Sequence, residues 1–239
     1  MNEPADNRMY NVSADQEFVF SCGPHVGCFN ECCRDLNQFL TPYDVLRLRN
    51  HLGMTSTDFL ETYTLRHDGP MTGLPVITLR PREGAGRRCP FVGIDGCRVY
   101  EDRPASCRMY PVARMARRDR KTGRIDETFL LIREPHCMGF SDGPRQTAAH
   151  WMENQGLGPY NAANDRMIEI IGIKQRHHPG GLPQALSDRI YVALYDQDRS
   201  MAETSPGQGP KPMSGDENDT SRLDAALQQV AGWLRNDLP

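Results

Sequence analysis

Eight cysteines are the residues of this chain with the clearest capacity for chemistry. Four of them fall within twelve positions and the others follow in a looser series: Cys22, Cys28, Cys32, Cys33, Cys89, Cys97, Cys107 and Cys137. Clustered thiols in a reducing compartment indicate metal binding or redox chemistry more often than disulfides. The polar N-terminus lacks the basic-then-apolar pattern of an export signal, and we therefore expect a cytoplasmic protein with reduced thiols.

The spacing of the thiols narrows the choice of metal chemistry. Soft thiolates select zinc, Cu(I) or iron–sulfur clusters. Zinc knuckles usually carry two cysteines separated by two residues, and the sequence lacks both this spacing and the three-cysteine run of radical enzymes built on S-adenosylmethionine. Adjacent Cys32 and Cys33 point to different sides of a regular strand or helix, so they share one centre only on irregular backbone. Eight thiols suffice for two four-thiolate sites, or for one cluster with spare thiols.

Burial in a core is the alternative role for each cysteine, because free cysteine is among the most buried residue types. The loop from Cys22 to Cys33 contains two glycines and a proline and shows no helical or strand periodicity. Such a backbone is suited to wrap around a metal, so we favour metal binding there. Cys137 stands alone, and its position leaves ligand and core roles equally open. His25 and His136 lie close to cysteines, but we interpret them as loop residues.

Positive charge surrounds the later cysteines. Residues 80–124 carry 13 Lys and Arg against 5 Asp and Glu. Such a block is typical of a nucleic-acid surface, but a divalent metal held by four thiolates is itself an anion that needs nearby cations. Because the block contains three of the cysteines, we favour local charge compensation and expect no nucleic-acid partner.

Arg103 and Arg108 flank Cys107 and are the candidate cofactor-binding residues. A guanidinium can donate to ligand sulfurs, tune a redox potential or hold an anionic substrate. The alternative for both residues is an ion pair with Glu101 or Asp102. The sequence contains no nucleotide-binding glycine loop, nucleophile elbow or recognisable carboxylate pair, so it assigns no catalytic residue.

Local patterns predict a mixture of helices and strands. Thr41, Pro42 and Asp44 are the residue types of a helix cap, first turn and capping box, and Gly53 is suited to end that helix. Further helices are expected at 57–63, 161–175 and 183–196, and strands at 18–20, 76–79, 112–118 and 125–132. The last two strands form a hairpin whose second arm leads to Cys137, which returns this thiol toward the others.

We predict an α+β protein built on a small, loop-rich cysteine-cluster metal-binding domain with a helical C-terminal extension. Its segments are a flexible N-terminus at 1–16, the metal-binding domain at 17–140, a helical extension at 141–200, a disordered linker at 201–220 and an amphipathic helix at 221–239. The last helix carries Leu223, Leu227, Val230 and Leu234 along one face, and it either binds a protein partner or docks back. No stretch approaches the length of a membrane span, so no membrane partner is expected.

Three motifs stand out in the cysteine-rich part of the chain. They are Cys28-x3-Cys32-Cys33, the segment Leu40-Thr-Pro-Tyr-Asp-Val-Leu-Arg47, and Cys89-Pro-Phe followed by Cys97-Arg-Val-Tyr-Glu-Asp-Arg-Pro-Ala-Ser-Cys-Arg-Met-Tyr-Pro111. Together they resemble the YkgJ family of cysteine-cluster proteins over residues 18–140. The resemblance implies a domain that chelates zinc or iron and is often described as an iron–sulfur protein. The family commonly places two residues between its first cysteines, whereas five separate Cys22 from Cys28 here. A similar cluster in flagellin lysine methylases adds protein modification to the implied roles.

An iron–sulfur cluster of the 4Fe–4S type is the favoured cofactor, in a protein that transfers electrons or forms part of a redox or modifying enzyme. The alternative is a structural zinc module that serves protein interaction without catalysis. A third hypothesis is a thiol-redox sensor that forms reversible disulfides. In the first two cases the expected ligands are the eight cysteines, and for the cluster Arg103 and Arg108 lie beside it.

Overall fold

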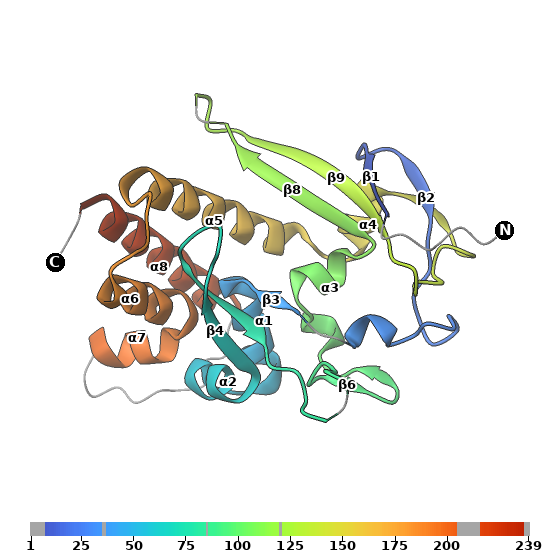
Figure 1. The fold of residues 1–239 in the computed structure, drawn as a ribbon, viewed down its shortest axis with the longest axis horizontal. Coiled ribbons are helices and arrows are strands. Elements are labelled where there is room, and N and C mark those ends of the chain that lie inside the picture. The colour runs from blue at the N-terminus through green and yellow to red at the C-terminus, as the bar shows by residue number, and fades with distance from the viewer. Residues whose placement is uncertain (1–7, 35–36, 85, 120, 205–215, 237–239) are drawn as a thin grey trace. The chain divides into compact units, whose positions relative to one another are not determined.

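The computed structural model describes residues 8–34, 37–84, 86–119, 121–204 and 216–236, and divides the chain into two units. The cysteine unit consists of residues 1–36 and 81–162, and the helical unit of residues 37–80 and 163–239. The first segment of the helical unit is therefore inserted into the sequence of the cysteine unit. Helix α5 (Gly158–His177) begins in the cysteine unit and continues into the helical unit (Figure 1).

Short antiparallel sheets contain most of the regular secondary structure of the cysteine unit. Its strand orders are β1-β9-β8, β10-β2 and β6-β7. The elements are β1 (Arg8–Val12), β2 (Glu17–Val19), β6 (Val92–Gly93), β7 (Gly96–Cys97), β8 (Val112–Arg118), β9 (Ile125–Arg133), β10 (Arg145–Thr147), α3 (Ala105–Met109), α4 (Ala148–Asn154) and the 3-10 helices η1 (Glu31–Cys33) and η2 (Tyr100–Asp102).

The β8–β9 hairpin is the longest regular structure of the cysteine unit, and its turn is specified locally. The carboxylate of Asp119 accepts from the backbone N–H groups of Lys121 at 2.9 Å and Thr122 at 2.6 Å. Gly123 adopts φ 72°, a conformation that costs glycine little. These contacts set the register of β8 against β9, and β9 then carries the chain toward Cys137.

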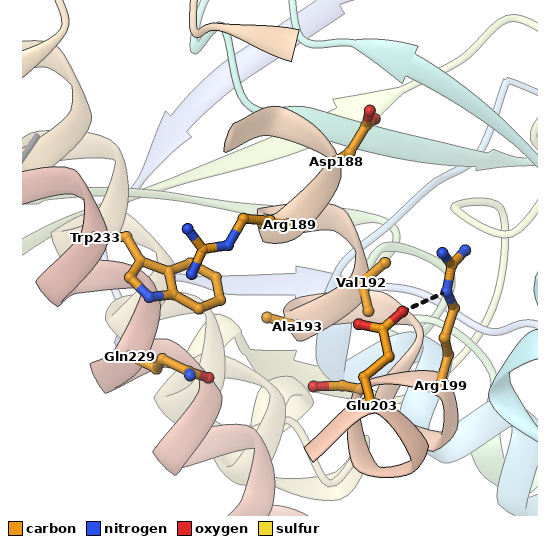
Figure 2. Close-up of a pocket in the computed structure, with 9 residues that line it drawn as sticks. Asp188, Arg189, Val192, Ala193, Arg199, Glu203, Gln229 and Trp233 are labelled. Atoms are coloured by element: carbon orange, nitrogen blue, oxygen red, sulfur yellow. Dashed lines mark hydrogen bonds and ion pairs between the residues drawn. The ribbon is translucent and has the colours of Figure 1, made fainter. Parts of the chain in front are cut away.

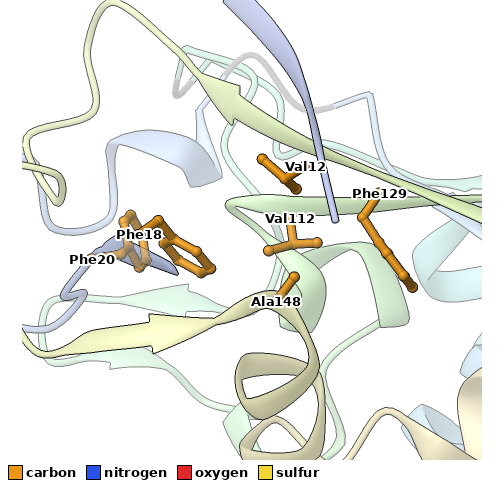
Figure 3. Packing of buried hydrophobic residues seen from close by; sticks show 6 residues of the cluster. All are labelled: Val12, Phe18, Phe20, Val112, Phe129 and Ala148. Carbon is orange, nitrogen blue, oxygen red and sulfur yellow. The ribbon is translucent and has the colours of Figure 1, made fainter. Parts of the chain in front are cut away.

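The core of the cysteine unit lies where these sheets meet helix α4. Its buried members are Val12, Phe18, Phe20, Val112, Phe129 and Ala148 (Figure 3). Phe20 is only 1% exposed and makes edge-on contacts with Tyr110, Phe140 and Trp151, at ring-centroid distances of 6.0, 5.0 and 5.4 Å. Edge-on packing of this kind adds about 0.5–1.5 kcal/mol per pair to the effect of burial. Cys137 packs at the edge of the same cluster.

The helical unit contains one small sheet and most of the helical residues. The sheet order is β3-β5-β4, and α6 packs on β5 and against α1, α7 and α8. The elements are β3 (Phe39–Leu40), α1 (Pro42–Leu52), α2 (Ser56–Tyr63), β4 (Thr64–Asp68), β5 (Pro75–Leu79), α6 (Gln184–Tyr195), α7 (Gln197–Thr204) and α8 (Asp216–Asn236), together with the greater part of α5.

Helix α1 has both of the ends that its sequence predicts. The Thr41 side chain accepts from the N–H of Asp44 at 3.2 Å, while the Asp44 carboxylate accepts from the N–H of Thr41 at 2.8 Å. Pro42 occupies the first turn, and Gly53 ends the helix at φ 64°. Caps of this kind stabilise a helix by about 0.5–2 kcal/mol because they satisfy backbone donors that the helix leaves unpaired.

Helix α8 docks back on its own unit. Leu223, Leu227, Val230 and Leu234 are buried, and the helix packs against α1 and α6. The sequence leaves open whether this helix binds a partner or docks back on the protein. In the structure its apolar face docks back. Binding of a partner by the rest of the helix stays a prediction.

A buried ionic network fastens α8 and α7 to the first helices of the unit. Arg49 on α1 lies 3.2 Å from the Asp219 carboxylate of α8 and 3.6 Å from the Asp198 carboxylate of α7. Asn50 also donates to Asp219 at 2.9 Å, and the backbone N–H of Ser56 donates to Asp198. Loss of Asp219 would leave the buried charge of Arg49 facing only the more distant carboxylate of Asp198 within this network.

A surface pocket of 330 Å³ lies in the helical unit among α6, α7 and α8 (Figure 2). The Arg189 guanidinium lies over the Trp233 ring at 4.3 Å, and Arg199 pairs with Glu203 at 2.9 Å. The charge of Arg199 is therefore paired with Glu203, and that of Arg189 is stacked on Trp233. The pocket lining contains no cysteine.

The structure confirms the predicted α+β class with a helical C-terminal region. It divides the chain differently from the predicted segments, because residues 37–80 belong with the C-terminal helices to the helical unit. The sequence predicts a flexible N-terminus, but its residues 8–12 form strand β1, which pairs with β9. The ends of the predicted linker, 201–204 and 216–220, belong to α7 and α8, while 1–7, 205–215 and 237–239 lie outside the described residues. No helix in the described ranges is long and apolar enough to cross a membrane.

Replacement of Asp219 by alanine tests the buried ionic network. We expect Asp219→Ala to lower the free energy of unfolding by about 3–5 kcal/mol, because Arg49 then remains buried without its nearest carboxylate. The matched control, Glu203→Ala, removes one partner of an exposed ion pair and should cost about 0–1 kcal/mol. Urea unfolding followed by far-UV circular dichroism measures both, and equal losses would contradict this account of the network.

Candidate metal centre

The first cysteine loop is a succession of tight turns. In three of these turns a backbone N–H donates to the carbonyl three residues earlier. The pairs are Val26 to Gly23 at 2.9 Å, Phe29 to Val26 at 2.9 Å and Cys33 to Asn30 at 3.2 Å. Asn30 adopts φ 69°, in the left-handed region that asparagine tolerates better than most residues. Four thiols therefore lie on a backbone that is neither α-helix nor strand, as the Gly- and Pro-containing sequence predicts.

Two bonds tie this loop to the segment that carries Cys137. The N–H of Ser21 donates to the carbonyl of Gly139 at 2.9 Å, and the N–H of Met138 donates to the sulfur of Cys28 at 3.2 Å. A Cβ at Gly139 would lie 2.5 Å from the Ser21 carbonyl oxygen, so the approach requires glycine. The return of the chain at Gly139 thus brings Cys137 beside Cys28.

A further set of backbone bonds joins the end of the first loop to the second cysteine block. The N–H of Cys89 donates to the carbonyl of Cys33 at 2.8 Å. Val92 pairs with Cys97 across β6 and β7. Arg82 and Arg98 both donate to the carbonyl of Pro90, at 2.7 and 2.9 Å. These contacts hold Cys89 and Cys97 on neighbouring turns next to Cys33.

All eight cysteines are free thiols in the structure. Cys89 is buried, Cys22, Cys32 and Cys107 are exposed, and Cys28, Cys33, Cys97 and Cys137 are half-buried. The turns that carry Cys89 and Cys97 direct backbone donors at their sulfurs. Burial raises the pKa of the Cys89 thiol, and the N–H groups of Phe91 and Val92 oppose that rise. Burial likewise raises the pKa of Cys97, and the N–H of Val99 opposes it. Such donors stabilise a thiolate, the form that binds metal.

Adjacent Cys32 and Cys33 interact directly. The thiol of Cys33 donates a hydrogen bond to Cys32, which lowers the pKa of Cys32 from 9.0 to about 7. The same bond raises the pKa of Cys33, and burial adds to the rise. Above about pH 7 the metal-free pair therefore presents mainly a thiolate at Cys32 and a thiol at Cys33.

The two candidate arginines have different surroundings. Arg103 is buried, lies 3.7 Å from the Tyr100 ring centroid and donates to the side chain of Gln155. Its charge also opposes the burial that raises the pKa of Cys97, so it lies within electrostatic reach of that sulfur. This placement is compatible with the role of a cation beside the cofactor.

Arg108 is engaged with backbone carbonyls. It donates to the carbonyls of Arg103 at 3.1 Å, Gln155 at 2.8 Å and Glu101, and its guanidinium lies 4.8 Å from the Tyr160 ring centroid. These contacts fasten the short helix α3, which carries Cys107. They favour a positioning role for Arg108 over direct contact with a cofactor, and the ion pair with Glu101 that the sequence offered is replaced by a bond to its carbonyl.

Tyr110 lies beside the thiol of Cys137. Its hydroxyl oxygen is buried, and no described residue meets it in full hydrogen-bond geometry. Burial raises the pKa of Tyr110, and the adjoining Cys137 and Glu134 add to the rise. The phenol in turn opposes the burial that raises the pKa of Cys137. The two histidines near the cysteines contact oxygen atoms. The His25 ring is hydrogen-bonded to the Ser21 hydroxyl at 2.6 Å, and the His136 ring lies 3.5 Å from the Glu134 carboxylate.

The donor set fits a thiophilic metal in its chemistry. Eight reduced thiols share one unit, backbone N–H groups point at several of their sulfurs, including those of Cys28, Cys89, Cys97 and Cys137, and cations lie nearby. Among the described residues, however, no three His, Cys, Asp or Glu side chains already converge as a ligand set. The thiols are arranged as neighbouring pairs, notably Cys28 with Cys137 and Cys32 with Cys33.

Residues 21–138 match the model of the CxxCxxCC family, which is described as a putative zinc- or iron-chelating domain. Residues 21–138 are therefore a CxxCxxCC domain. Membership of the CxxCxxCC domain accounts for the presence of all eight cysteines in one unit. The function of this domain is metal binding. The match spans all eight cysteines and agrees with the resemblance that the motifs carry. A search of curated proteins and of solved structures found no match to the chain.

The pKa of Cys32 gives a testable prediction for the metal-free protein. Because that pKa is lowered to about 7, the reactive thiolate is present above this pH and is lost as the pH falls below it. Alkylation of Cys32 by iodoacetamide, followed by peptide mass spectrometry, should therefore reach half its maximal rate near pH 7.

A Cys33→Ala variant supplies the control, since it removes the donor and should move the Cys32 profile to higher pH. Cys22 provides an internal comparison, because burial and the charges of neighbouring cysteines raise its pKa. A Cys32 profile that is the same with and without the Cys33 thiol would contradict the proposed hydrogen bond.

Proposed function

We propose that the CxxCxxCC domain holds an iron–sulfur cluster and that the protein works in electron transfer or as part of a redox or modifying enzyme. The observation that carries the proposal is the gathering of eight free thiols in one unit, on turns that direct N–H groups at their sulfurs. Cysteine thiolates are the usual ligands of such clusters.

The surroundings of the thiols support this choice. The Met138 N–H to Cys28 bond of 3.2 Å is of the kind that sets the reduction potential of a cluster. Arg103 places a buried positive charge beside Cys97, which favours the more negative, reduced state of a bound cluster. A cluster would supply one-electron chemistry, while Arg108 and the core around Phe20 keep the loops in place.

The location and partners of the protein follow as proposals from the same features. Thiols of this number remain reduced in the cytoplasm, and the free state of all eight agrees with that compartment. A protein partner is proposed for α8, whose apolar face is already buried, so its exposed residues would make the contact.

Anaerobic purification of the full-length chain tests the cluster directly. We expect brown protein with sulfur-to-iron charge-transfer absorption in the visible range, and iron and acid-labile sulfide in equal amounts. Protein that is colourless and carries stoichiometric zinc after the same handling, and that stays colourless after anaerobic reconstitution with iron and sulfide, would contradict the proposal.

Structural zinc is the second candidate, and the turns at Cys89 and Cys97 are the observation that supports it. Each directs backbone N–H groups at a sulfur, an arrangement that also suits a closed zinc site. In that case the metal contributes directly to folding. A chelator should then unfold the cysteine unit, seen as loss of near-UV circular dichroism from the aromatic cluster around Phe20. Retention of that signal after complete zinc removal would exclude the structural role.

A further inference from the structure

The adjacent thiols Cys32 and Cys33 mark a division within the cysteine unit. Both lie in the 3-10 helix η1, where successive side chains are about 120° apart around the axis. They therefore leave the backbone in different directions.

The first group forms around the return of the chain at Gly139. The Ser21 N–H bond to Gly139 sets the residue before Cys22 against the segment that carries Cys137. The Met138 N–H bond to the Cys28 sulfur closes the same region from the other side. Backbone bonds thus make Cys22, Cys28 and Cys137 neighbours.

The second group forms around the turn at Cys89. The backbone N–H of Cys89 donates to the carbonyl of Cys33 at 2.8 Å. Cys97 on β7 pairs with Val92 on β6. Arg103 links this region to α3, because both Cys97 and Cys107 act on its charge. The second group is therefore Cys33, Cys89, Cys97 and Cys107.

We propose that the eight thiols form two separate four-thiolate metal centres, divided between Cys32 and Cys33. The first centre consists of Cys22, Cys28, Cys32 and Cys137, and the second of Cys33, Cys89, Cys97 and Cys107. This inference deepens the proposed function, on which it rests for the binding of a thiophilic metal, whether as a cluster or as zinc.

Electrostatic neighbours agree with the division. The thiols whose charges act on Cys22 are Cys32, Cys28 and Cys137, which are the other members of the first centre. Those that act on Cys33, besides adjacent Cys32, are Cys89 and Cys107 of the second centre. Cys32 also acts on Cys97 and so lies at the border. We assign Cys32 to the first centre because the backbone bond between the Cys89 N–H and the Cys33 carbonyl places Cys33 in the second.

The charge of the region matches this assignment. A tetrathiolate centre with a divalent metal carries net negative charge and needs nearby cations. Arg82 and Arg98 lie within electrostatic reach of thiols in the second centre, and Arg103 lies within reach of Cys97 and Cys107 there and of Cys22 in the first centre. Because no three side chains already converge, we expect metal to draw in the exposed members, Cys22 and Cys32 in the first centre and Cys107 in the second.

Anaerobic titration of the metal-free, full-length protein with Co²⁺ counts the centres. Two tetrathiolate sites should bind about two equivalents of Co²⁺, each with sulfur-to-cobalt charge-transfer absorption and the visible bands of tetrahedral coordination. Cys28→Ser and Cys97→Ser, one from each centre, should each reduce binding to about one equivalent. A double variant within one centre, Cys28→Ser with Cys137→Ser, should lose no more than Cys28→Ser. The double variant across centres, Cys28→Ser with Cys97→Ser, should lose both equivalents.

Protection from alkylation provides a second readout that does not depend on metal count. In metal-loaded Cys28→Ser, iodoacetamide should modify Cys22, Cys32 and Cys137 while the second centre stays protected, and Cys97→Ser should give the reverse pattern. Met115→Leu, a substitution at an exposed position of the hairpin, is the matched control and should change neither readout.

The outcomes separate this inference from the proposed function. Loss of all metal by each single variant, or about one equivalent in the unaltered protein, overturns the division while metal binding stands. Joint exposure of thiols from both groups in a single variant overturns it as well. Failure of the unaltered protein to bind any thiophilic metal, including iron on reconstitution with sulfide, overturns both proposals.

Discussion

The packing of Phe20 is the contact on which the cysteine unit depends. This ring is almost completely buried and contacts Tyr110, Phe140 and Trp151, which come from three distant parts of the unit. It stands two residues before Cys22, so its position fixes where the first cysteine loop starts. The Phe20 carbonyl also accepts from the buried Gln146 side chain at 3.0 Å, which ties the same residue to β10. Of the cysteines, Cys137 packs at the edge of this core.

This arrangement separates the scaffold from the ligands. Aromatic packing and the β8–β9 hairpin define where the segments meet, whereas the loops that carry the thiols are joined by single backbone bonds. A metal can then reorganise the thiols without disturbing the core, because rotation of a few exposed side chains is cheap compared with repacking buried rings. Gly139 and Gly143 serve the same end: a Cβ at Gly143 would lie 2.8 Å from the Phe20 backbone, and Gly143 also adopts φ 146°.

The sequence was sufficient where structure depends on neighbours along the chain. The α1 capping box requires only Thr41 and Asp44, three residues apart, and the hairpin turn requires only residues between Asp119 and Arg124. The cysteine loop was recognised in the same way, from composition and from the motifs shared with the family.

The sequence was insufficient where structure depends on contacts between distant segments. Strand β1 is stabilised by pairing with β9, and residues 37–80 by packing with the C-terminal helices. Arg108 looked like a cofactor residue because it adjoins Cys107, but its donors bind carbonyls as far away as Gln155. Nothing in the local pattern around Cys28 indicates that Met138 would donate to its sulfur. The partition of the thiols likewise depends on bonds between segments that are far apart in sequence.

Sulfur from these cysteines, and not nitrogen or oxygen, is proposed to surround the metal. Metal K-edge X-ray absorption of anaerobically purified, full-length protein measures the first coordination shell directly. We predict a shell of sulfur alone, at about 2.3 Å from the metal. A shell dominated by nitrogen or oxygen at about 2.0–2.1 Å would contradict the assignment of the cysteines as ligands.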